Sequence, residues 1–176
     1  MVLSGAGVMS FDTDTLVAWG GNYGPLDHGW GLLRLISCQF VHGGFGHVTD
    51  NMYGLLFAGY VLSPVARNMR LIAAYLVTGL GGSIASAAMH PDTVSVGASG
   101  AIFGLFGVAL ALGLLGDSRL TLMRRIIFVN VAIYMALNFF LGWTTPGIDN
   151  AAHVGGALTG LALGWVLHRM DGCRRL

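Results

Sequence analysis

The chain has 176 residues, of which 55% are hydrophobic and only 10% are charged, and its net charge is +1. An ordinary soluble domain carries about 25% charged residues, so this composition argues against that class of protein. A nearly neutral chain also gives no reason to expect a nucleic-acid partner. The 28 glycines lie largely inside apolar runs, as in membrane helices that pack closely together. Composition therefore predicts a membrane protein.

The first 46 residues are predicted to be an N-terminal remnant and a first loop. Residues 1–9 are apolar but too short to cross a bilayer, and they lack the positively charged start of a signal peptide. Residues 11–46 mix aromatic and charged side chains with short apolar stretches. Leu32 and Leu33 beside Trp30 favour a partly interfacial helix or loop.

Five apolar segments follow, each near the roughly 20 residues that a spanning helix needs. They cover residues 47–64, 71–89, 97–115, 126–142 and 151–168. The connections are short, so we expect one domain over residues 1–176. It would have a helical core at residues 47–168 and a cytoplasmic tail at 169–176. The predicted fold class is an all-α, polytopic membrane helix bundle.

The arginines predict the orientation of this bundle. The chain has nine arginines and no lysine, and eight of the nine follow the first, third or fifth segment. These are Arg67, Arg70, Arg119, Arg124, Arg125, Arg169, Arg174 and Arg175. With five spans, all eight lie on one side, which the positive-inside rule makes cytoplasmic. We therefore expect a cytoplasmic C-terminus.

Three polar groups then fall at the opposite, non-cytoplasmic end. His47 and Asn51 open the first segment, Ser99 lies at the start of the third, and His153 lies at the start of the fifth. Each residue alone has a plainer interpretation, such as a helix cap for Ser99 or an interfacial position for His153. Polar groups in spans are costly, however, and their convergence on one face indicates a shared site.

These residue types fit nucleophilic catalysis. A serine hydroxyl becomes a good nucleophile when an adjacent imidazole takes its proton. Attack on an amide carbonyl builds an oxyanion, which needs preset hydrogen-bond donors. His47 and Asn51 are four residues apart and project from one helix face. The backbone N–H of Ser99, in the first turn of its helix, is a third candidate donor.

Small residues predict close packing of the helices that carry Ser99 and His153. Gly100 and Gly104 are four apart on the third segment, and Ala152, Gly156, Gly160 and Gly164 continue at the same spacing on the fifth. Such stripes allow two helix backbones to approach each other. Phe103 follows Ser99 by four residues and is predicted to stack on the imidazole.

Other polar residues are given structural interpretations. Asp149 is expected to cap the last helix rather than to complete a triad. His42 and His47 lack the additional ligands of a zinc site, so no metal is expected. Asp50 is costly beside Asn51 unless it faces water or an arginine, and the sequence identifies no partner for it. Cys38 and Cys173 are expected to be unpaired thiols.

Over residues 19–168 the chain resembles the rhomboid family of intramembrane serine proteases. The segment Gly97-Ala98-Ser99-Gly100 is similar to the family's nucleophile motif. The segment Ala152-His153-Val154-Gly155-Gly156 resembles its histidine motif. His47 with Asn51 is similar to its oxyanion motif, and Trp30 to Arg34 resembles its first-loop region.

The resemblance implies a Ser99–His153 dyad, no cofactor, and cleavage of single-pass membrane proteins near the outer face. Such an enzyme would be an integral membrane protein, which we expect in a bacterial plasma membrane. The family core has six spans, and we expect the first to be missing or truncated here, since residues 1–9 are too short to cross a bilayer. Thr49, Asp50 and Leu33 also depart from the family pattern, which is apolar at the first two positions and has tryptophan at the third.

Two rival functions remain at this point. A catalytically inactive, rhomboid-like adaptor would bind transmembrane helices without cutting them, and would have no chemical need for both Ser99 and His153. A small transporter or channel would need charged residues along a pathway, and the middles of the five segments contain none.

Overall fold

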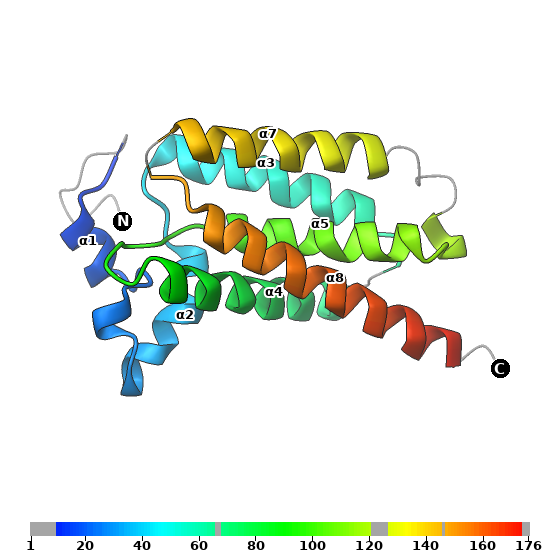
Figure 1. The fold of residues 1–176 in the computed structure, drawn as a ribbon, viewed down its shortest axis with the longest axis horizontal. Coiled ribbons are helices and arrows are strands. Elements are labelled where there is room, and N and C mark those ends of the chain that lie inside the picture. Colours follow the sequence, from blue (N-terminus) through cyan, green and yellow to red (C-terminus); the bar gives the residue numbers. More distant parts are fainter. Residues whose placement is uncertain (1–9, 66–67, 121–126, 146, 174–176) are drawn as a thin grey trace.

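The computed structural model describes residues 10–65, 68–120, 127–145 and 147–173, which form a bundle of helices (Figure 1). The long helices are α3 (Phe45–Leu62), α4 (Asn68–Met89), α5 (Ser99–Leu114), α7 (Ala132–Thr144) and α8 (Asn150–Cys173). The shorter elements are α1 (Thr13–Ala18), η2 (Gly24–Leu26), η3 (Gly29–Leu33), α2 (Arg34–Ser37), η4 (Cys38–Phe40), η5 (Ser118–Leu120) and η6 (Ile127–Val131), a π-helical turn that leads into α7. These described residues contain no strand, which confirms the all-α prediction.

Helix α5 lies at the centre of the bundle, with α3 and α7 on one side of it and α4 and α8 on the other (Figure 1). Its residues from Gly100 to Ala109 are all buried, whichever way they face. A helix that is apolar on every side is stable only when other helices surround it. The central position of α5 follows from that composition.

The small-residue stripes pack α8 closely against α5, as predicted. A methyl group added to Gly156 would collide with the carbonyl oxygen of Gly100, and one added to Gly160 would collide with that of Gly104. The two backbones are therefore in direct contact, which only glycine permits. This contact places the beginnings of α5 and α8 side by side.

The segment before α3 forms short helices at the end of the bundle where α3, α5 and α8 begin (Figure 1). Asn22 and Ser95 exchange two backbone hydrogen bonds of 2.9 Å, and the Gly97 N–H donates to the Cys38 carbonyl at 2.9 Å. One guanidinium nitrogen of Arg34 donates to the carbonyls of Val17 and Gly21. These bonds hold the loop between α4 and α5, which leads into Ser99.

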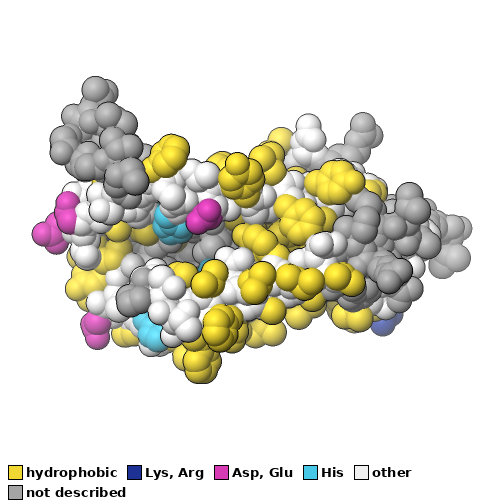
Figure 2. All heavy atoms as spheres, turned by 90° about the horizontal axis from the view of Figure 1, so that it is seen from above, with side chains coloured by type: hydrophobic (Ala, Val, Ile, Leu, Met, Phe, Trp, Pro, Cys, Tyr) yellow, Lys and Arg dark blue, Asp and Glu magenta, His cyan; other side chains and the backbone are white. Residues whose placement is uncertain are grey.

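Hydrophobic side chains cover much of the face that Figure 2 shows. Over the described residues as a whole, many large hydrophobic side chains are exposed, among them Leu56, Met69, Leu137, Phe140, Trp143 and Leu158. In water such a surface would be unfavourable, whereas lipid tails would cover it without cost. The surface therefore has the character of a membrane protein.

Each predicted span corresponds to a helix, with ends shifted by a few residues. Among the described residues, α4 is the helix that is both long and apolar enough to cross a membrane by length and composition. Residues 99–114 and 129–144 form apolar helices that are shorter. Polar residues near the start of α3, including His47, Asp50 and Asn51, lower its apolar character. The number of spans thus stays a prediction.

The orientation prediction rests partly on residues outside the described part of the chain. Arg67, Arg124, Arg125, Arg174 and Arg175 lie outside it, as do residues 1–9 and the side chains of Arg119 and Cys173. Arg70 lies in the first turn of α4 and Arg169 lies near the end of α8, and these two helix ends share one end of the bundle (Figure 1). Cys38 is buried and unpaired.

Candidate active site

Ser99 and His153 are in contact, although 54 positions separate them in the chain. The Oγ atom of Ser99, the first residue of α5, lies 2.9 Å from Nε2 of His153 in the first turn of α8. His153 is 4% exposed, so its ring is held in one place by its surroundings. This is the nucleophile–base distance that serine activation requires.

The imidazole of His153 is held from one side by Phe103. The two rings are stacked, with centroids 4.2 Å apart and planes inclined by 3°. Phe103 is one helical turn after Ser99, so the same helix positions the hydroxyl and the ring that supports its partner. The predicted stacking is confirmed.

His47 and Asn51 lie on α3 and line the same cavity as Ser99. The N–H of Gly43 donates to Nδ1 of His47 over 3.2 Å. A neutral imidazole that accepts at Nδ1 carries its proton on Nε2, so Nε2–H is a donor. The side-chain amide of Asn51 donates one N–H to the His47 carbonyl over 2.9 Å and keeps a second N–H for another acceptor.

Gly97 keeps the space between these donors and Ser99 open. Its φ of +114° lies in a region that L side chains rarely adopt. A Cβ atom built on Gly97 would lie 2.5 Å from Nε2 of His47 and 3.5 Å from Nδ2 of Asn51. Glycine is therefore needed here for both its backbone conformation and its missing side chain.

These residues line one cavity of about 460 Å³. Its walls include the starts of α3, α5 and α8, part of α4 and the adjoining loops, together with α7, which contributes Tyr134 and Asn138. A serine, a base and two side-chain donors thus share a space large enough for a peptide group and water. The arrangement can support acyl transfer.

A family model described as the rhomboid domain matches residues 29–170. The chain belongs to the rhomboid family. Members of this family are integral membrane proteins, and the helical bundle described above is a rhomboid domain.

Several curated relatives agree with this membership. "RHOMBOID-like protein 4" of Arabidopsis thaliana is 41% identical over 141 residues, which are 80% of this chain and 34% of that protein. "RHOMBOID-like protein 2" of the same plant is 41% identical over 139 residues, or 79% of this chain and 42% of that protein. "Rhomboid protease GluP" of Bacillus subtilis is 34% identical over 151 residues, or 86% and 29%. The chain thus spans less than half the length of these relatives.

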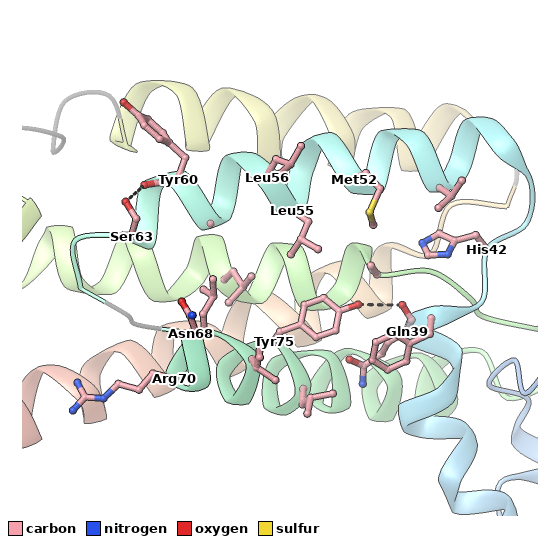
Figure 3. Close-up of a pocket in the computed structure, with 18 of the residues that line it drawn as sticks. Gln39, His42, Met52, Leu55, Leu56, Tyr60, Ser63, Asn68, Arg70 and Tyr75 are labelled. Carbon is pink, nitrogen blue, oxygen red and sulfur yellow. Dashed lines mark hydrogen bonds between the residues drawn. The ribbon is translucent and has the colours of Figure 1, made fainter.

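A larger cavity of about 1480 Å³ lies between α3 and α4 of this rhomboid domain (Figure 3). Met52, Leu55 and Leu56 line it from α3, and Tyr75 donates a hydrogen bond to the Gln39 carbonyl at its edge. Neither Ser99 nor His153 lines this groove. The larger space is therefore not where the nucleophile and base meet.

Asp149 caps α8 of the rhomboid domain, as predicted, through a 3.0 Å hydrogen bond from the Ala152 N–H to its Oδ1. Burial acts to raise its pKa, but hydrogen bonds from Ser86, Ser95 and Ala152 outweigh burial and hold the pKa of this carboxyl below its usual 3.8. Nδ1 of His153 is buried without a hydrogen-bond partner in the described part of the chain. Asp149 therefore does not complete a triad through that atom.

His42 packs edge-to-face on His47, with ring centroids 5.2 Å apart. Burial, aided by the neighbouring His47, lowers the pKa of His42 to about 4, so this ring is neutral near pH 7. Across the described residues, no group of three His, Cys or Asp side chains is placed to hold a metal ion.

The sequence prediction missed several polar residues that line the cavity. Tyr134 and Asn138 are four residues apart on α7, and Ser83, Ser95 and Gln39 come from α4 and the loops. A four-residue spacing of polar groups inside an apolar segment was a visible signal for Tyr134 and Asn138. No comparable pattern marks Gln39, which precedes the helical core and is 2% exposed.

Proposed function

We propose that this rhomboid chain is an intramembrane serine endopeptidase with Ser99 as nucleophile and His153 as general base. The single observation that supports this most strongly is the 2.9 Å contact between Ser99 Oγ and His153 Nε2. The name of the Bacillus subtilis relative, a rhomboid protease, supports the same reaction.

In the proposed reaction, Ser99 Oγ attacks the carbonyl carbon of the scissile peptide bond. The proton of the hydroxyl passes to Nε2 of His153 as the new C–O bond forms. The tetrahedral intermediate then collapses, the C–N bond breaks, and His153 donates that proton to the leaving amine. Water next attacks the acyl-enzyme, giving a proton to His153, which returns it to Ser99 as the carboxylic acid leaves.

The oxyanion of both intermediates needs donors that are in place before the reaction. We assign this role to Nε2–H of His47, the free N–H of the Asn51 amide and the backbone N–H of Ser99. The last of these opens α5 and so has no partner within its own helix. Gly97 and Gly100 flank Ser99 and leave room for the substrate carbonyl.

The proposed substrates are single-pass transmembrane proteins, cut near the non-cytoplasmic face. The cavity lies at the end of the bundle opposite Arg70 and Arg169, which supports this side for cleavage and a cytoplasmic C-terminus. A bacterial plasma membrane as the compartment stays a prediction. No cofactor is required by the proposed chemistry.

The proposal is tested by labelling purified protein with a serine-directed covalent inhibitor. Wild-type protein should be labelled, Ser99→Ala should not be labelled, and His153→Ala should be labelled far more slowly because the hydroxyl loses its base. Ser63→Ala, at the opposite end of α3, is the matched control and should be labelled like the wild type. Circular dichroism checks that each variant is folded.

Cleavage of a reporter membrane protein should show the same pattern as labelling. The wild type and Ser63→Ala should cleave it, His153→Ala should cleave it far more slowly, and Ser99→Ala should not cleave it. Cleavage that persists in Ser99→Ala would remove the proposed nucleophile. A folded wild-type protein that is neither labelled nor active would favour the inactive adaptor instead.

A further inference from the structure

Asp50 is an ionisable residue in a position where the proposed reaction has no use for it. It lies on α3, about one and a half turns after Phe45, and its side chain is exposed. Asp50 also lines the cavity that contains Ser99 and His153. An ionisable group within an apolar helix is costly, and it is usually retained when it faces a cavity and binds something there.

The neighbours of Asp50 place it on the side of α3 that faces α7. Gly54, four residues further along α3, approaches α7 so closely that a Cβ there would lie 2.5 Å from the Tyr134 hydroxyl. Tyr134 and Asn138 line the cavity on that side. The carboxylate of Asp50 therefore stands between α3 and α7, at the wall of the reaction cavity.

The charges around the cavity are unbalanced. Asp50 and Asp149 are its acidic lining residues, and no arginine lines it within the described part of the chain, which contains no lysine at all. Asp149 already accepts hydrogen bonds from Ser86, Ser95 and the Ala152 N–H. Asp50, by contrast, interacts electrostatically with His47 and Tyr134, and neither of these is a permanent cation.

We propose that Asp50 determines substrate specificity by favouring substrates that carry lysine or arginine beside the scissile peptide bond. A cationic side chain would compensate the carboxylate at the cavity wall, whereas an acidic side chain would be repelled. This inference rests on the proposed endopeptidase function and adds the class of substrate. Asp50 acts here on the flanking residue of the substrate and takes no part in the bond-breaking steps.

The test uses three reporter transmembrane peptides that differ only in the residue next to the cleavage site, which is lysine, glutamine or glutamate. For wild-type protein, kcat/KM should be about tenfold higher for the lysine peptide than for the glutamate peptide. Asp50→Asn should bring this ratio close to one, and Asp50→Lys should reverse it. Each ratio is measured within one variant, so a partly unfolded preparation does not alter it.

Asp92→Asn is the matched control, because Asp92 is an exposed aspartate at the same end of the bundle that does not line the cavity. It should keep the wild-type ratio. Equal cleavage of the three peptides by wild-type protein, or an unchanged ratio in Asp50→Asn, would overturn the inference while leaving the proposed reaction intact.

A binding measurement separates this inference from the proposed function. In Ser99→Ala protein the peptides stay intact, and the lysine peptide should bind about tenfold more tightly than the glutamate peptide. Adding Asp50→Asn should remove that difference in affinity. If the wild-type protein shows no Ser99-dependent cleavage but the binding preference is present, only the protease proposal is rejected. Equal affinities for the two peptides would reject the role of Asp50.

Discussion

The proposed reaction needs Nε2 of His153 to be without a proton and Nε2 of His47 to carry one. Nε2 of His153 must accept the Ser99 proton, so its neutral ring carries a proton on Nδ1. Nε2 of His47 is a donor, because its Nδ1 already accepts the Gly43 N–H. A hydrogen bond from a loop backbone thus makes His47 suited to bind an oxyanion and unsuited to act as a base.

Removing the Asn51 amide tests the proposed oxyanion site. Asn51→Ala should lower kcat by about 10²-fold and change KM little, because the lost N–H acts mainly when charge develops on the oxygen. Asn138→Ala is a matched control, since its amide likewise donates to the carbonyl four residues earlier. Steady-state kinetics on a membrane reporter would measure both. A similar decrease in the two variants would indicate general damage to the cavity.

Among the helices, the contact between α5 and α8 determines whether the site exists. Ser99 and His153 each lie at the beginning of one of these helices, so a shift of either helix separates the hydroxyl from the imidazole. The glycines that permit the backbone contact are therefore part of the support for the site. Substituting these glycines would lower activity by moving Ser99 or His153, because the glycines themselves take no part in the reaction.

Adding one methyl group to this contact should destabilise the bundle. In Gly160→Ala the new Cβ would collide with the Gly104 carbonyl oxygen, and we expect a loss of about 1–3 kcal/mol in unfolding free energy. Gly59→Ala on α3 makes the same change where the Cβ would lie 3.9 Å from Leu71, an ordinary contact. It should be neutral or slightly stabilising because alanine favours helix. Thermal unfolding in detergent would measure both, and equal melting temperatures would contradict the packing argument.

For the molecule as a whole, the two ends of the bundle differ in charge and in chemistry. The cavity with Ser99 and His153 lies at one end, and Arg70 and Arg169 lie near the other (Figure 1). Because arginine is retained on the cytoplasmic side of membranes, the reaction would occur on the opposite side. The apolar surface between the two ends would face lipid.

Cysteine labelling in intact cells would test this orientation. In a Cys173→Ser background, Asp92→Cys should react with a membrane-impermeant maleimide from outside, because residue 92 lies in the loop beside the cavity. Ser118→Cys, beyond the other end of α5, should react only after the cells are permeabilised. The reverse pattern of labelling would place the cavity on the cytoplasmic side.

Much of this fold and site could be predicted from local patterns in the sequence. Apolar segments predicted the five long helices, because each helix satisfies its own backbone hydrogen bonds within a contiguous stretch of chain. Four-residue spacings predicted the α5–α8 contact and the stacking of Phe103, since such positions share a helix face. Motif resemblance then indicated which serine and histidine to pair.

Contacts between residues far apart in the chain required the tertiary structure. The proton position on His47 depends on a loop N–H, the closeness of Gly97 to His47 depends on how α3 meets the α4–α5 loop, and the role inferred for Asp50 depends on which helix faces it. The sequence by itself determined the helices and the residue types of the site, because those follow from local periodicity. Only the packing of the helices decided their distances and partners, because these depend on the whole bundle at once.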